Sequence, residues 1–264
     1  MPGPEPRELL MTLETTLYKA GIDIAGVIAQ LGQVQASEDR EGGKFFEFRD
    51  HLRGLILSLL SNQRPWEPIA RNRDQIDAIF FNYDPDRVQA TDPLQFVWSL
   101  RDIRCGNRAM VKQMDCLSVN IATMKRIVSE RGSLDEFVES ADPDSIAKAL
   151  SDPGPYKLKQ VGFALALEYL RNVGIRAAKP DSHILRVLSG QCLGYLSDRP
   201  KPIEASVLVA KLAKLSGSNP TYLDNLLWML CAKNYGDICG EKPRCHDCGF
   251  ERTCNFPHSR PVIG

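Results

Sequence analysis

Proline and glycine divide the sequence into segments whose apolar residues mostly recur with a helical period. The clearest is the segment 50–63. Five of its apolar residues repeat at intervals of three and four positions: Leu52, Leu55, Ile56, Leu59 and Leu60. This spacing places them on one face of an α-helix. Few stretches alternate between apolar and polar residues as half-buried strands do. The pattern predicts an all-α protein. The polar, glycine-containing segment from Gln33 to Lys44 is expected to be a linker or loop.

The size and charge of the chain limit what it can bind. Its 264 residues suffice for one large domain or two moderate ones. Lys plus Arg and Asp plus Glu both number 33, so global charge alone cannot attract nucleic acid, although a local basic face can. The sequence has no apolar run of membrane-spanning length, and its start lacks a secretory layout. We expect a cytoplasmic protein, associated with the nucleoid if it is bacterial, that does not bind membranes.

Four cysteines lie close together near the C-terminus, in the spacing C-x5-C-x2-C-x5-C: Cys239, Cys245, Cys248 and Cys254. A loop this polar has no core of its own, so a metal centre could stabilise it. Structural zinc loops usually contain two close cysteine pairs, and only Cys245 and Cys248 form one here. A cubane iron–sulfur cluster therefore suits the spacing better, with zinc or no metal as the alternatives. The scattered cysteines are expected to be small buried apolar residues: Cys105, Cys116, Cys192 and Cys231.

The segment 158–188 combines a tight turn with an acidic residue at a helix start. The turn at Val161-Gly162 opens a predicted helix beside Lys157 and Lys159, which is a natural seat for a phosphate. Further on, Asp181 follows a proline where the next helix begins. Its carboxylate could stabilise a developing cation, or it could cap the helix, and the two roles are compatible.

These motifs, in this order, resemble those of the helix-hairpin-helix DNA glycosylase superfamily, in particular its iron–sulfur branch around endonuclease III and the adenine mismatch glycosylase. The segment 158–162 resembles the family's hairpin. The segment from Asp181 to Arg186 resembles its signature of an acid, a small residue, His, an apolar residue, any residue and Arg. The cysteine loop is similar to the cluster loop, with one residue fewer between the first two ligands. The end of the segment 50–63 is similar to a segment whose final glutamine lies near the flipped nucleotide. The resemblance runs from about Phe48 to Cys254.

The resemblance implies two helical lobes with a cleft between them: residues 45–189 with the hairpin, and residues 1–44 plus 190–264 with the cluster loop at 239–254. It implies a [4Fe-4S] cluster on the four cysteines and a monomer that binds double-stranded DNA with one nucleotide flipped out. Asp181 is the implied catalytic residue. The implied DNA-binding residues are Gln63, Lys157, Lys159, Gln160, Val161, Gly162 and Ala164.

Two departures from the family pattern refine this prediction. Gln160 occupies the position of the hairpin's first glycine. Ala164 stands where bifunctional members carry a lysine, and alanine cannot form a Schiff base with the sugar. We therefore expect a monofunctional glycosylase, in which water attacks C1′ and Asp181 stabilises the sugar cation. The segment from Leu55 to Gln63 lacks the acid of adenine mismatch glycosylases, so uracil, mismatched thymine, alkylated bases and modified pyrimidines stay open as targets. A catalytically inactive DNA-binding relative with a structural cluster, and a zinc-stabilised protein unrelated to DNA, are the alternatives.

Overall fold

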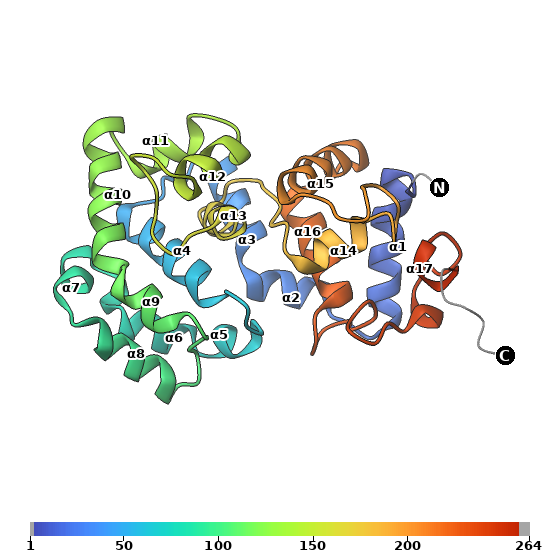
Figure 1. Cartoon of the computed structure of the whole chain (residues 1–264), viewed down its shortest axis with the longest axis horizontal. Helices are drawn as coiled ribbons and strands as arrows, with labels where there is room; N and C mark the ends of the chain where they lie inside the picture. Colours follow the sequence, from blue (N-terminus) through green and yellow to red (C-terminus); the bar gives the residue numbers. More distant parts are fainter. Residues whose placement is uncertain (1–2, 259–264) are drawn as a thin grey trace. The chain divides into compact units, whose positions relative to one another are not determined.

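The computed structural model describes residues 3–258, and all regular secondary structure in this range is helical (Figure 1). No residue in the range lies in a strand, which confirms the predicted all-α fold class. The chain divides into two compact units. We call residues 31–176 the central unit, and residues 3–30 with 177–258 the terminal unit. Within residues 3–258, no helix combines the length and apolar character that crossing a bilayer requires.

Eleven α-helices and one short 3₁₀ helix form the described central unit: α3 (Gln33–Glu41), α4 (Phe48–Leu60), α5 (Glu67–Arg71), α6 (Arg73–Ile79), η1 (Phe81–Tyr83), α7 (Pro85–Ala90), α8 (Pro93–Asp102), α9 (Met110–Asp115), α10 (Leu117–Arg131), α11 (Leu134–Glu139), α12 (Pro143–Ser151) and α13 (Phe163–Asn172). Many begin at a proline or behind a capping side chain. For example, Asp142 accepts from the Ser145 N–H at the start of α12. Several helices therefore begin at an aspartate N-cap followed by a proline.

Helices α4 and α13 pack side by side and form the centre of this unit (Figure 1). Gly54 makes the close approach possible, because a Cβ there would lie 3.0 Å from Val173 and 3.3 Å from Asn172. The Ser58 hydroxyl donates to the Leu165 carbonyl at 2.6 Å, and the Asn172 amide donates to the Gly54 carbonyl at 3.0 Å. The helix that begins at the predicted hairpin is thus fixed against α4, in which nine of 13 residues are buried.

The segment 33–44 is largely helical, so the prediction of a loop there was wrong. Helix α3 buries polar residues instead of apolar ones, which is why it shows no hydrophobic period. The Gln33 amide donates to Glu168 at 3.1 Å and to Asn172 at 2.8 Å. The Arg40 guanidinium bonds to the Asp135 carboxylate and donates to the Val173 carbonyl at 2.7 Å. Since buried polar groups are stabilised only by such partners, α3 is held by hydrogen bonds to α11 and α13.

The terminal unit contains α1 (Pro6–Lys19), α2 (Ile24–Leu31), which ends at the boundary, α14 (Ser182–Leu188), α15 (Pro202–Ser216), α16 (Pro220–Cys231), η2 (Cys245–Asp247) and α17 (Asn255–His258). Leu9, Leu13 and Leu17 of α1 are fully buried and pack into one core with residues of α14, α15 and α16. The three leucines have the i, i+4, i+8 spacing of an amphipathic helix face.

The central unit begins at residue 31 and ends at residue 176, whereas the predicted lobe begins at 45 and ends at 189, its partner being 1–44 plus 190–264. Both observed boundaries therefore lie closer to the N-terminus than the predicted ones. Helix α3 belongs to the central unit because of its bonds to α13. Helix α14 belongs to the terminal unit because Ile184, Val187 and Leu188 are buried in that unit's core. Residues 1–2 and 259–264, which the prediction assigns to the lobe with the cluster loop, lie outside the described range.

Candidate functional site

The predicted hairpin is a tight turn that runs directly into α13. Leu158 and Val161 are buried at the two ends of the turn, with exposed fractions of 1% and 2%. Between them Gln160 has a φ of 60°, in the left-handed region. A non-glycine residue in that region costs about 1–2 kcal/mol. The turn is therefore strained at Gln160.

A buried asparagine that sequence reasoning missed holds the turn in place. Asn120 of α10 is fully buried. Its side-chain oxygen accepts from the Lys159 N–H at 2.7 Å, and its amide donates to the Lys159 carbonyl at 3.1 Å. The Lys157 ammonium closes the hairpin from inside, because it donates to the carbonyls of Ser151 and, at 2.7 Å, of Val161. Lys159 is left as the exposed lysine of the turn.

The first turn of α13 is open towards solvent. Gly162, its N-cap residue, is exposed, and a Cβ built there would meet no atom within 4 Å. No side chain among the described residues caps this helix start. Ala164 lies in the first turn and is only half-buried. Uncapped N–H groups at a helix start attract anions, so Lys159, Gly162 and the amides that follow can accommodate a phosphate.

Gln63 lies just beyond α4, which ends at Leu60 rather than continuing to Gln63 as predicted. It is exposed and has a φ of 50°. The next residue, Arg64, donates to the carbonyls of Arg104 and Gly106. The Asn107 amide adds a bond to the Leu59 carbonyl at 2.9 Å. These bonds hold the loop after α8 against the end of α4. Two arginines of that loop, Arg104 and Arg108, are exposed, as is Gln63.

Asp181 is the N-cap of α14. Its Oδ1 accepts from the His183 N–H at 2.8 Å and from the Ile184 N–H at 3.1 Å. Its Oδ2 accepts no hydrogen bond from another described residue, and the side chain is half-buried. The preceding backbone is fixed because the Lys179 N–H donates to the buried Asp224 at 2.8 Å. The capping role is therefore present, and it orients the carboxylate while one oxygen stays available for chemistry.

Helix α14 also connects Asp181 to the cysteine loop. Arg186, five residues after Asp181, donates to the Cys239 carbonyl. The four cysteines of the loop line one cavity with Arg186 and the apolar side chains Ile238, Pro243, Phe256 and Pro257. All four are free thiols. Among residues 3–258, no three His, Cys, Asp or Glu side chains converge on the position of a single metal ion.

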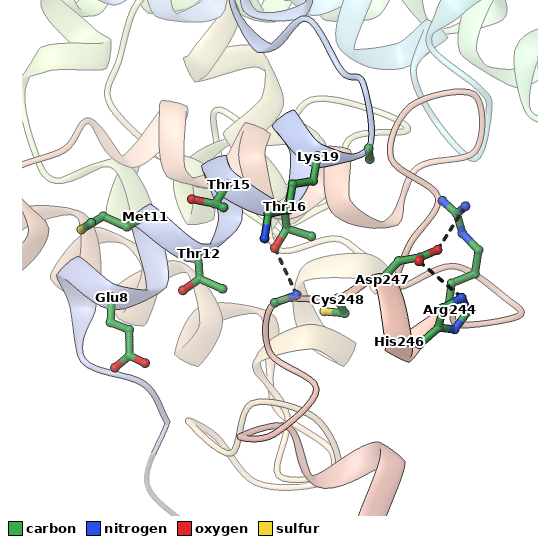
Figure 2. A pocket seen from close by; sticks show the side chains of 12 residues that line it. Glu8, Met11, Thr12, Thr15, Thr16, Lys19, Arg244, His246, Asp247 and Cys248 are labelled. Carbon is green, nitrogen blue, oxygen red and sulfur yellow. Dashed lines mark hydrogen bonds and ion pairs between the residues drawn. The ribbon is translucent and has the colours of Figure 1, made fainter.

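The same loop packs against α1. The Gly249 N–H donates to the Thr16 hydroxyl at 3.2 Å, and both residues line an open groove of about 1050 Å³ (Figure 2). A Cβ at Gly249 would lie 2.7 Å from Thr12 and Thr16, so only glycine permits this approach. Cys248 lines both the groove and the cysteine cavity.

Two further thiols lie beside the cysteine loop, although the spacing of the cysteines in the sequence does not indicate this. Cys192 lines the same cavity, and Cys192 and Cys231 both lie within hydrogen-bond reach of Cys239. Their hydrogen bonds lower the pKa of Cys239 to about 3. The prediction that Cys192 and Cys231 are buried was confirmed, but they are not merely apolar filling. Cys105 is buried as expected, whereas Cys116 is half-buried.

The fold is similar to that of solved 8-oxoguanine DNA glycosylases. The enzyme of Thermotoga maritima is 21% identical, with a TM-score of 0.58 over 86% of this chain and 97% of that one. The enzyme of Methanocaldococcus jannaschii is 18% identical, with a TM-score of 0.56 over 84% of this chain and 94% of that one. The glycosylase/lyase of the same organism, in complex with a 15mer DNA containing 8-oxoguanine, is 17% identical, with a TM-score of 0.55 over 83% and 96%.

No family model and no curated protein matches the sequence. At these identities the likeness to the solved structures establishes the fold. The predicted membership of the iron–sulfur branch stays a prediction.

Proposed function

We propose that this chain is a monofunctional DNA glycosylase that hydrolyses the N-glycosidic bond of a base flipped out of duplex DNA. The observation that carries the proposal is the hairpin: a left-handed turn at Gln160 that presents the uncapped start of α13. Such a helix start binds a backbone phosphate without reading sequence. The fold around it is similar to that of DNA glycosylases, one of which is bound to lesion-containing DNA.

Asp181 supplies the chemistry in this proposal. Breaking the bond between base and sugar builds positive charge at C1′. A carboxylate beside C1′ stabilises that charge and can orient or deprotonate the attacking water. Because Oδ1 is held by the amides of His183 and Ile184, the carboxylate keeps its direction throughout the reaction. Oδ2 is the oxygen that would face the sugar and the water.

The absence of strand cleavage follows from Ala164. Its methyl side chain cannot attack C1′, so the covalent sugar intermediate of bifunctional members has no nucleophile at this position. Water is then the nucleophile, and the product is an abasic site in an intact strand. The neighbour in complex with DNA is described as a glycosylase/lyase, so this chain would differ from it in that respect.

The cysteine loop fits a [4Fe-4S] cluster better than zinc. Structural zinc loops usually contain two close cysteine pairs, and here only Cys245 and Cys248 form one. All four cysteines line one shared cavity. Bound on Cys239, Cys245, Cys248 and Cys254, a cluster would cross-link a loop that has little core of its own. Arg186 and the Gly249 contact with α1 then position the loop in the terminal unit.

The test is base release from a panel of duplexes. The panel contains 8-oxoguanine, on which the structural neighbours act, together with uracil, mismatched thymine, alkylated bases and modified pyrimidines. We expect the wild type to release one class of base and to leave the strand intact until alkali is added. Asp181→Asn is the matched control, because asparagine caps a helix as well as aspartate does. Binding to every duplex without release from any would instead support the inactive DNA-binding relative.

A further inference from the structure

Asn107 bonds to the ends of two helices at once. Its side-chain amide donates to the Leu59 carbonyl at 2.9 Å and to the Leu60 carbonyl at 3.4 Å, at the C-terminus of α4. Its side-chain oxygen accepts from the Ala109 N–H at 2.8 Å, at the start of α9. The last carbonyls and the first N–H groups of a helix lack their regular partners within the helix. Asn107 therefore joins the end of α4 to the start of α9.

Gln113 fixes the direction in which the Asn107 amide points. Gln113 lies in α9 and is fully buried, and its side-chain oxygen accepts from the Asn107 amide at 3.0 Å. The amide nitrogen of Asn107 thus faces acceptor oxygens, and its side-chain oxygen faces an N–H. Rotating the amide by half a turn would break all of these bonds, because it would exchange donor and acceptor. Asn107 is therefore held in one orientation.

The turn that Asn107 holds carries Gln63, which is exposed and has a left-handed φ of 50°. A non-glycine residue keeps such a strained backbone only where the surrounding structure fixes it. Arg64 supplies part of this constraint, since it donates to the Arg104 and Gly106 carbonyls. Asn107 donates in the opposite direction, from the loop back to α4. Bonds made both ways between the two loops thus fix where Gln63 stands.

Helix α9 extends from this turn to the hairpin. At its far end the Cys116 thiol donates to the Lys159 carbonyl at 3.4 Å, and the Asn120 amide donates to the Cys116 sulfur at 3.6 Å. Helix α9 has six residues, which corresponds to a length of about 9 Å. The Gln63 turn and the proposed phosphate seat are therefore bonded to opposite ends of one short helix.

We propose that Asn107 is a positioning residue that holds Gln63 at a fixed place relative to the hairpin. Gln63 then enters the space left by the flipped base while the hairpin holds a backbone phosphate. The inference rests on the proposed glycosylase function and adds a residue that acts through Gln63 without touching the base. Without the Asn107 amide, the protein would still bind duplex through the hairpin, but Gln63 would no longer stand where it stabilises the flipped state.

The probe is a duplex that contains a tetrahydrofuran abasic analogue with 2-aminopurine as the neighbouring base. Insertion of a side chain at the abasic position unstacks the 2-aminopurine and raises its fluorescence. Affinity for the same duplex is measured separately by the anisotropy of an end label. We expect Asn107→Ala to keep the affinity within about threefold and to lower the equilibrium constant for insertion about tenfold, as the loss of one or two hydrogen bonds predicts.

Two variants separate positioning from stability. Asn107→Ser should lower insertion as Asn107→Ala does, because serine still caps α9 but is too short to reach the α4 carbonyls. The double variant of Gln63→Ala with Asn107→Ala should insert no less than Gln63→Ala alone, because Asn107 acts through Gln63. Gln89→Ala is the matched control and should behave as the wild type. Its amide joins α7 to the Ser118 carbonyl of α10 at 3.5 Å and touches neither loop.

Full insertion by Asn107→Ser would overturn the inference, and so would a loss of affinity as large as the loss of insertion. A double variant that inserts less than Gln63→Ala would also overturn it, because Asn107 would then act by another route. A wild type that binds the probe with no rise in fluorescence would refute the role of Gln63 and this inference together. Normal differences on the probe, with no base released from any duplex of the lesion panel, would refute the proposed activity and support the positioning role of Asn107.

Discussion

Replacing Asn120 by alanine should loosen the hairpin on which the proposed phosphate contact depends. The substitution removes two hydrogen bonds to the backbone of Lys159, at 2.7 Å and 3.1 Å. Each contributes about 1 kcal/mol net, and a backbone group left without a partner adds to the loss. We expect Asn120→Ala to lower the free energy of unfolding by about 2–3 kcal/mol. The clamp also opposes the strain of about 1–2 kcal/mol at Gln160, so the turn should relax when the clamp is lost.

The assay combines urea denaturation, hydrogen exchange at the Lys159 amide and binding to duplex DNA. Exchange at that amide should accelerate, and affinity for duplex should fall roughly tenfold, which corresponds to about 1.4 kcal/mol. Thr123→Ala is the matched control, because Thr123 is a half-buried residue of the same helix whose hydroxyl donates to the Val119 carbonyl of that helix and not to the hairpin. If Asn120→Ala kept both the protection of the Lys159 amide and the affinity for DNA, the clamp would have no part in binding.

Three further predictions follow from the same geometry. Gln160→Gly should raise the free energy of unfolding by about 0.5 kcal/mol in urea denaturation, since relief of left-handed strain exceeds the entropy cost of glycine; a decrease would contradict the strain. Burial lowers the pKa of His51, and hydrogen bonds from His51 and Arg40 lower that of Asp135 although burial opposes them. Groups with depressed pKa values stabilise the fold above their unfolded values of about 6.5 and about 3.9 and lose that contribution as pH falls. Melting temperature should therefore fall between about pH 6.5 and pH 5. His51→Gln should remove this slope, and an equal slope would exclude His51 as its source. Ala164→Lys should make the enzyme trappable on substrate DNA by borohydride, whereas a trapped wild type would show that another lysine acts.

The helices could be predicted where burial is apolar, and they were missed where burial is polar. The period of Leu52, Leu55 and Leu59 predicted α4, because each of these residues is fully buried. Helix α3 gave no such signal, since Gln33 and Ser37 are its buried residues and their partners are polar. A pattern of hydrophobicity reports burial in an apolar core and cannot report a helix held by hydrogen bonds.

In the candidate site, features formed by residues close in sequence could be predicted, whereas contacts between residues far apart in sequence could not. The hairpin and the capping role of Asp181 are encoded within a few residues and could be read from the sequence. Asn120 could not, because its partner Lys159 lies 39 positions away and only the packing of α10 brings them together. Cys192 and Cys231 likewise look like isolated buried cysteines until the fold places them beside Cys239.

The most direct test of the proposed chemistry is the rate of base release from the preferred duplex under single-turnover conditions, with wild-type enzyme and with Asp181→Asn. We predict that the variant folds, binds the duplex with the affinity of the wild type and releases base at least about 100-fold more slowly, the order of loss seen when one group that stabilises developing charge is removed. Release by Asp181→Asn at the rate of the wild type would contradict the account.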